Sequence, residues 1–132
     1  MENVEVTGAF GEKPSLAFAE ALASPELQVE VLQEGTGPEV QPGQTLVCDY
    51  LGQVWGGSVF DNSFDRGQPL TFQVGVGMVI AGWDEGLIGQ RVGSRVLLSI
   101  PSDMGYGPYG QPAAGIKGGD TLVFVTDIIA AS

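Results

Sequence analysis

The chain has 132 residues, 43% of them hydrophobic and 16% charged, which is enough for one folded domain with a hydrophobic core. Sixteen acidic residues against five basic ones give a net charge of −11, which argues against nucleic acid as a partner because such a surface repels phosphate backbones. The absence of histidine and the single cysteine, Cys48, exclude histidine-based catalysis, an internal disulfide and a cysteine-built zinc site.

The hydropathy of the chain and the pattern of its first residues predict where in the cell the protein is located. No apolar run approaches the ~18 residues that a membrane span needs, and the first residues lack the pattern of a signal peptide. We therefore expect a cytoplasmic protein without a membrane span. The alternative is an exported or envelope-anchored domain whose signal segment is absent from this chain. The acidic surface is expected to keep a small monomer in solution.

The N-terminal part of the chain predicts strands of unequal clarity. Residues 4–10 alternate only weakly between apolar and polar side chains, and residues 15–23 fit either a strand or a helical turn. Residues 27–33 alternate clearly, because apolar side chains occupy every second position. Residues 35–43 form a cluster of turn-favouring residues.

The rest of the chain is dominated by strand patterns. A long strand is predicted over residues 44–57, where the glycines blur its end, and a short one over residues 69–75. The clearest strands are residues 94–101 and 120–130, which are rich in β-branched and aromatic side chains. Residues 102–119, between these two, read as a long loop rich in turn residues.

One helix of about two to three turns is predicted over residues 79–89, with the sequence VIAGWDEGLIG. Ile80, Trp83 and Leu87 recur at the steps of one helix face. Each glycine weakens a helix by roughly 0.5–1 kcal/mol relative to alanine, so packing against a sheet must hold this one in place. Its glycines would also let it lie close to the strands.

These patterns together predict the architecture. A single amphipathic helix buries its face against a sheet. We therefore expect an α+β fold, in which a curled, mainly antiparallel sheet of five to six strands, a half-barrel, wraps around one short helix. Residues 1–43 are expected to form an N-terminal extension with the first strands, and residues 44–132 the core, within one structural domain.

Two motif-like stretches fail the requirements of the sites that they suggest. The glycines in residues 75–82 have the wrong spacing for a dinucleotide fingerprint. Residues 61–67 look like the start of a calcium loop, but Arg66 occupies the place of the turn glycine and Phe72 that of the bidentate glutamate. We expect no metal and no cofactor.

Aromatic side chains gather near the ends of the predicted elements. Core packing explains any one of them, but residues at such ends line cavities more often than they fill the centre of a core. Phe60 lies at a strand-to-loop junction, Trp83 at a helix start and Tyr106 in a loop rich in glycine and proline. Their grouping indicates an aromatic cavity.

Four short motifs between residues 44 and 130 carry a resemblance to a known family. They are FD at 60–61 before an arginine, VIxGW at 79–83, YGxxG at 106–110 and TLVF at 121–124. With them, the sequence closely resembles the FKBP-type peptidyl-prolyl cis-trans isomerases, the macrolide-binding immunophilins. The N-terminal extension is similar to those of bacterial members.

The resemblance implies an isomerase that rotates X-Pro peptide bonds in folding proteins by binding the prolyl ring in a dry aromatic pocket. The alternative is a non-catalytic prolyl- or macrolide-binding module. The residues implied to be catalytic are Tyr50, Phe60, Asp61, Trp83, Tyr106 and Phe124. Those implied to bind substrate or inhibitor are Leu70, Val79, Ile80 and Ile116, and Arg66 is implied to support the site structurally.

Individual roles follow from the same resemblance. Trp83 would form the floor of the pocket, while the Ile80 N–H and the Tyr106 hydroxyl would bind carbonyl groups. Asp61 would be held in a network with Tyr50 and Arg66. The sequence departs from the family at Leu70, where many members carry an aromatic residue, and in the loop at 112–117, which is about one residue longer.

The implied chemistry suits this composition. Rotation about a peptide bond meets a barrier of about 18–20 kcal/mol, most of it lost resonance, and its twisted transition state needs no nucleophile, metal or proton relay. The implied partners are proline-containing polypeptides as substrates and macrolides of the rapamycin type as inhibitors.

Overall fold

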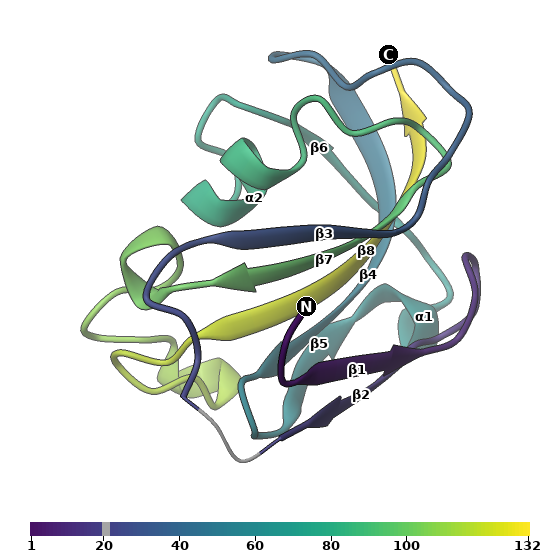
Figure 1. The fold of residues 1–132 in the computed structure, drawn as a ribbon. Coiled ribbons are helices and arrows are strands. Elements are labelled where there is room, and N and C mark those ends of the chain that lie inside the picture. Colours follow the sequence, from purple (N-terminus) through teal and green to yellow (C-terminus); the bar gives the residue numbers. More distant parts are fainter. Residues whose placement is uncertain (20–21) are drawn as a thin grey trace.

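The computed structural model describes residues 1–19 and 22–132. Within these ranges the chain forms eight strands and two short α-helices (Figure 1). The strands are β1 (Val4–Thr7), β2 (Ser15–Phe18), β3 (Gln28–Gln33), β4 (Thr45–Val54), β5 (Val59–Asn62), β6 (Leu70–Gln73), β7 (Arg95–Ile100) and β8 (Leu122–Ala131). The helices are α1 (Ser63–Arg66) and α2 (Ala81–Gly86), and two 3-10 turns are η1 (Ser102–Met104) and η2 (Pro112–Ala114).

Six of the described strands form one antiparallel sheet in the order β3-β7-β8-β4-β5, with β6 also pairing with β4. The ten-residue strand β4 is long enough to pair with two strands on the same side: its first half pairs with β6 and its second half with β5. On its other side β4 pairs with β8 along its whole length. The predicted α+β fold with a curled antiparallel sheet is confirmed.

Several elements differ from the sequence-based expectation. The strand β5 and the one-turn helix α1 were not predicted. Asn62 accepts a hydrogen bond from the Asp65 N–H at 2.8 Å and so caps α1, and Gly67 ends it with a left-handed φ of 68°. Residues 15–23 give the strand β2, while residues 20–21 of that prediction lie outside the described residues.

The helix α2 is shorter than the predicted range 79–89, because Ile80 remains extended at its start with φ −60° and ψ 150°. It lies on the concave face of the sheet, where its glycines permit close approach. A β-carbon on Gly82 would lie 2.6 Å from atoms of Ile100, and one on Gly86 only 2.3 Å from Leu98 Cδ2. Packing against β7 therefore holds a helix that its own propensities would not form.

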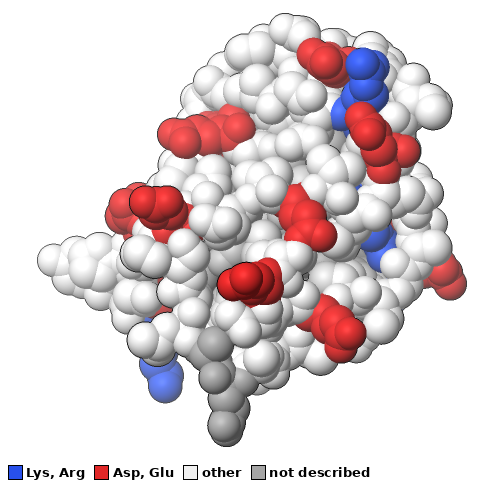
Figure 2. All heavy atoms as spheres, in the orientation of Figure 1, with Lys and Arg blue, Asp and Glu red and all other residues white. Residues whose placement is uncertain are grey.

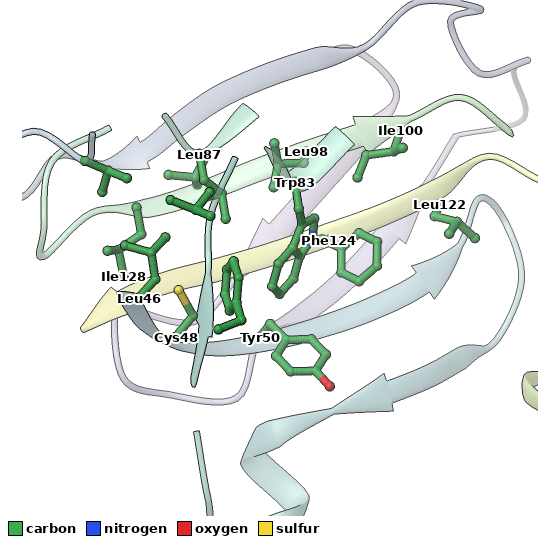
Figure 3. Close-up of a cluster of buried hydrophobic side chains, with 14 of the residues drawn as sticks. Leu46, Cys48, Tyr50, Trp83, Leu87, Leu98, Ile100, Leu122, Phe124 and Ile128 are labelled. Carbon is green, nitrogen blue, oxygen red and sulfur yellow. The ribbon is translucent and has the colours of Figure 1, made fainter. Parts of the chain in front are cut away.

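The hydrophobic core on the concave face extends from α2 to the strands β4, β7 and β8. Figure 3 shows Trp83 and Leu87 from α2 and the turn after it facing apolar side chains of the sheet, among them Leu98 and Phe124. The Tyr50 hydroxyl points out of this cluster (Figure 3). The concave core therefore opens at the end where Tyr50, Trp83 and Phe124 meet.

The convex face of the sheet is covered by the hairpin of β1 and β2, on the side away from α2 (Figure 1). Val4 packs there against Leu97, Val123 and Val125. Under the hairpin the buried pair Arg95 and Asp127 forms two hydrogen bonds of 2.7 and 2.8 Å.

The hairpin turn supplies further partners to this ion pair. The Arg95 guanidinium donates to the carbonyl oxygens of Gly8 at 2.8 Å and Glu12 at 2.5 Å, and the Gly11 N–H donates to Asp127 Oδ2 at 2.8 Å. These bonds fix the hairpin on the sheet.

None of the helices in the described part of the chain has the length and hydropathy that are needed to cross a bilayer.

Candidate active site

A cavity of about 360 Å³ opens at the exposed end of the concave core, between α2, the sheet and the loop of residues 102–119. Residues from four strands, one helix and two loops contribute to it. Its lining residues are Tyr50, Phe60, Asp61, Leu70, Met78, Val79, Ile80, Trp83, Tyr106 and Phe124.

The floor of the cavity is the indole of Trp83, in the first turn of α2 and only 3% exposed. The rings of Tyr50 and Phe124 stand nearly perpendicular to it, each with its centroid 5.3 Å from the indole. Phe72, which does not line the cavity, packs against the indole at 5.2 Å from another side. Perpendicular ring pairs of this kind are favourable, so the floor is held by its neighbours rather than by the short helix alone.

One wall of the cavity is the edge-on pair of Phe60 and Phe124, whose ring centroids lie 5.6 Å apart. The approach depends on Gly52 in β4, because a β-carbon there would lie 2.7 Å from a ring carbon of each phenylalanine. A residue without a side chain is therefore needed behind this wall.

A charged network stands at the rim. The Tyr50 hydroxyl donates a short hydrogen bond to Asp61 Oδ2, and Arg66 Nη1 donates to Asp61 Oδ1 at 2.6 Å. Arg66 Nη2 also donates to the Tyr50 hydroxyl oxygen at 3.1 Å. Both oxygens of the carboxylate thus have partners, which suits a fixed charge better than a proton relay.

The protonation of Tyr50 follows from this position. Burial raises the pKa of its phenol above the ordinary value, and the hydrogen bond to Asp61 raises it further, while Arg66 opposes both effects. The phenol therefore stays neutral at physiological pH. The Tyr50 hydrogen bond raises the pKa of Arg66, so the guanidinium remains charged.

The segment before α2 supplies the opposite rim. Asp84 in α2 accepts hydrogen bonds from the N–H groups of Gly75 at 2.8 Å and Gly77 at 2.9 Å, two residues with φ near +80°. These bonds fix the loop that presents Met78 and Ile80 to the cavity. Within the described ranges, no protein group accepts a hydrogen bond from the Ile80 N–H.

The structure brings together nine of the eleven site residues predicted from sequence. Arg66 lies just outside the lining, bonded to Asp61 and Tyr50. Ile116, expected to bind substrate, does not line the cavity: its side chain is 2% exposed and packs into the concave core below the loop. Sequence reasoning missed Met78, although it directly precedes the motif residue Val79.

The mouth of the cavity carries groups suited to binding. Among residues 1–19 and 22–132 no group of three or more metal-ligating side chains comes together. The Tyr106 hydroxyl has no protein partner within this part of the chain and the side chain is 39% exposed, so it and the Ile80 N–H are free donors at the mouth. An apolar ring flanked by two carbonyl groups would match this arrangement.

Comparisons with known proteins identify relatives of this chain. Residues 37–129 match a family model described as FKBP-type peptidyl-prolyl cis-trans isomerase. The chain is 42% identical over 120 residues to an FK506-binding protein from Streptomyces anulatus, covering 90% of this chain and 97% of the relative.

Plant proteins show the same similarity. The chain is 47% identical over 107 residues to peptidyl-prolyl cis-trans isomerase FKBP15-2 from Arabidopsis thaliana, covering 80% of this chain and 65% of that protein. The crystal structure of AtFKBP13 superposes with a TM-score of 0.74 at 35% identity, over 80% of this chain and 93% of that one. Sequence and fold therefore point to the same family.

Proposed function

The chain belongs to the FKBP-type peptidyl-prolyl cis-trans isomerase family, and we propose that the aromatic cavity above Trp83 is the active site in which this isomerase turns X-Pro bonds. The observation that carries this proposal is the set of four aromatic side chains, Tyr50, Phe60, Trp83 and Phe124, arranged around one cavity beside two free donors. The prolyl ring rests on the indole, and the peptide bond before it turns at the mouth.

Catalysis in such a site comes from differential solvation. A planar amide is charge-separated by resonance, whereas the twisted transition state has lost that resonance and is less polar. A dry aromatic cavity therefore destabilises the planar ground state relative to the twisted state. A rate gain of about five decades needs only ~7 kcal/mol of such preference.

The two free donors hold the substrate polypeptide in place while its X-Pro bond rotates. The Ile80 N–H binds one substrate carbonyl and the Tyr106 hydroxyl another, so the segments on either side of the X-Pro bond are kept in place. Asp61, fixed by Tyr50 and Arg66, contributes a negative potential at the rim without exchanging a proton.

The active-site assignment is tested by kcat/KM on one X-Pro peptide. Phe60→Ala should lower it by roughly ten-fold or more, because a wall that excludes water is removed. Tyr106→Phe should cost about two- to ten-fold, the range of one hydrogen bond. Phe18→Ala, which removes the same side chain as the first variant from the convex face, should leave kcat/KM within about two-fold. An active Phe60→Ala protein with a normal circular dichroism spectrum would refute the assignment.

A second proposal concerns inhibitors. Macrolides of the rapamycin type present a pipecolyl ring and acceptor carbonyls, which match the Trp83 floor and the donors of Ile80 and Tyr106. We expect competitive inhibition, and a change of indole fluorescence on titration that is lost in Trp83→Phe and retained in Trp55→Phe. Retention of the full response in Trp83→Phe would contradict binding in this cavity.

A further inference from the structure

A second cavity, of about 430 Å³, lies next to the first, between the turn that joins β4 to β5 and the loop around Lys117. Phe60 borders both cavities, so a polypeptide that leaves the first cavity past this ring enters the second. A phenyl ring is spanned by about two extended residues at about 3.3–3.6 Å each. The second cavity is thus within reach of a residue two or three positions from a bound proline.

The walls of the second cavity combine apolar and charged groups. Trp55, Val59 and Ala114 supply apolar surface. Asp120 also lines it, but Asp120 Oδ2 accepts a hydrogen bond from the Lys117 backbone N–H at 2.7 Å and so stabilises the loop itself. Lys117 is exposed at this cavity.

The charge of Lys117 is the distinctive feature. The four other basic side chains each lie within salt-bridge distance of a carboxylate: Lys13, Arg66, Arg91 and Arg95. Within residues 1–19 and 22–132, Lys117 alone among lysines and arginines has no such partner. In a chain of net charge −11, whose acidic side chains are spread over the surface in Figure 2, a cation without a carboxylate partner is unusual.

We propose that the second cavity is a subsite for the substrate segment flanking the X-Pro bond, and that Lys117 makes it favour a carboxylate side chain two or three residues from the proline. The proposal rests on the first cavity being the active site. The whole molecule repels acidic peptides at long range, so the preference lies in the position of the carboxylate and not in overall acidity. An exposed ion pair gives about two- to five-fold in kcat/KM.

The test uses peptides with a single Ala-Pro bond that carry either Glu or Gln at one position, two or three residues before or after the proline. For each pair, kcat/KM is measured by NMR exchange, and the Glu/Gln ratio is compared between positions. The wild-type protein should show a ratio about two- to five-fold higher at one of these positions than at the others.

Variants then assign the effect to Lys117. Lys117→Gln should reduce that ratio to the level of the other positions, and Lys117→Glu should invert it. Lys13→Gln, which removes the same charge from a side chain paired with Asp65 at 2.9 Å, should leave the ratio unchanged.

Equal ratios at all positions, or a ratio that survives Lys117→Gln, would overturn the subsite. So would an equal loss in Lys13→Gln, since that would indicate a general effect of charge. Failure of the active-site assignment looks different: the neutral peptides would be turned over equally well by the wild type and by Phe60→Ala.

Discussion

Gly52 sets how closely the rings of Phe60 and Phe124 approach each other in the wall of the proposed active-site cavity. A β-carbon at this position would lie 2.7 Å from ring carbons of both Phe60 and Phe124. We expect Gly52→Ala to displace both rings, lowering kcat/KM by about ten-fold and the free energy of unfolding by about 1–3 kcal/mol, as overpacking does elsewhere. Peptide turnover and urea unfolding measure the two effects. Unchanged turnover would mean that the spacing of the rings is immaterial.

Cys48 should make the stability of the fold depend on pH in the alkaline range. The thiol is completely buried, and burial, with smaller contributions from Asp127 and Asp49, raises its pKa from 9.0 to about 12. Above pH 9 the unfolded chain loses this proton while the folded chain keeps it, so stability falls as pH rises from about 9 to 12.

This coupling is measurable by urea unfolding at pH 8 and pH 10. The wild-type protein should lose about 1.4 kcal/mol more between these values than Cys48→Ala does, because the alanine variant lacks the titrating group. Every other side chain titrates in both proteins, so its contribution to the loss of stability cancels in the comparison. Equal losses would show that the thiol ionises without unfolding.

At the scale of elements, α2 and the loop before it are joined by Asp84. Asp84→Ala removes the acceptor of the Gly75 and Gly77 N–H groups, so the loop that carries Met78 and Ile80 should loosen. We expect KM to rise by about three- to ten-fold with a smaller change in kcat, and amide exchange at the two glycines to accelerate.

The matched control is Glu85→Ala, which removes the same charge from the neighbouring, exposed position of α2. It should leave KM and the exchange of both glycine amides unchanged. An effect as large as that of Asp84→Ala would mean that charge on the helix, and not the two hydrogen bonds, sets the affinity for peptide.

The sequence predicted elements well where a pattern was long enough. The strands β7 and β8 follow from runs of β-branched and aromatic residues, and β3 from its alternation. The elements β5 and α1 were missed because their shape comes from pairing with β4 and from the Asn62 cap, which no periodic pattern in the sequence reveals. The range of α2 was overestimated because apolar spacing continues past the last helical residue.

The site was predictable only through resemblance. Periodicity and composition placed aromatic residues near element ends, but these ends come together through the pairing of β4 with β5 and β8, which a single sequence does not reveal. The motifs supplied that information for nine residues. Ile116 lies instead in the concave core and does not line the cavity.

At the scale of the whole molecule, Arg95 joins the N-terminal hairpin to the sheet. Arg95→Met would leave Asp127 charged, buried and with the Gly11 N–H as a remaining donor. Removing one member of a buried pair typically costs about 3–5 kcal/mol, and we expect this loss in urea unfolding. Turnover by the folded fraction should change by less than about two-fold, because the pair lies on the face opposite the cavity.

Two further variants separate the charge from the packing. Lys13→Met, which removes an exposed ion pair with Asp65, should cost at most about 1 kcal/mol. The double variant Arg95→Met, Asp127→Leu should recover much of the loss, since no unpaired charge stays buried. A double variant as unstable as the single one would show that the hydrogen bonds to Gly8 and Glu12 carry the stability.

The strand order limits when this enzyme can fold during its synthesis. The strand β8 follows the other seven described strands in the chain, yet it lies between β7 and β4 and carries Phe124. While the ribosome is still adding residues before Leu122, β7 and β4 each lack one of their partner strands, and the cavity above Trp83 lacks the wall that Phe124 supplies. Folding must then wait for synthesis to pass this strand, and it proceeds through long loop closures, which are slow. The proposed active site of this isomerase thus cannot be completed until nearly all of its described chain has been made.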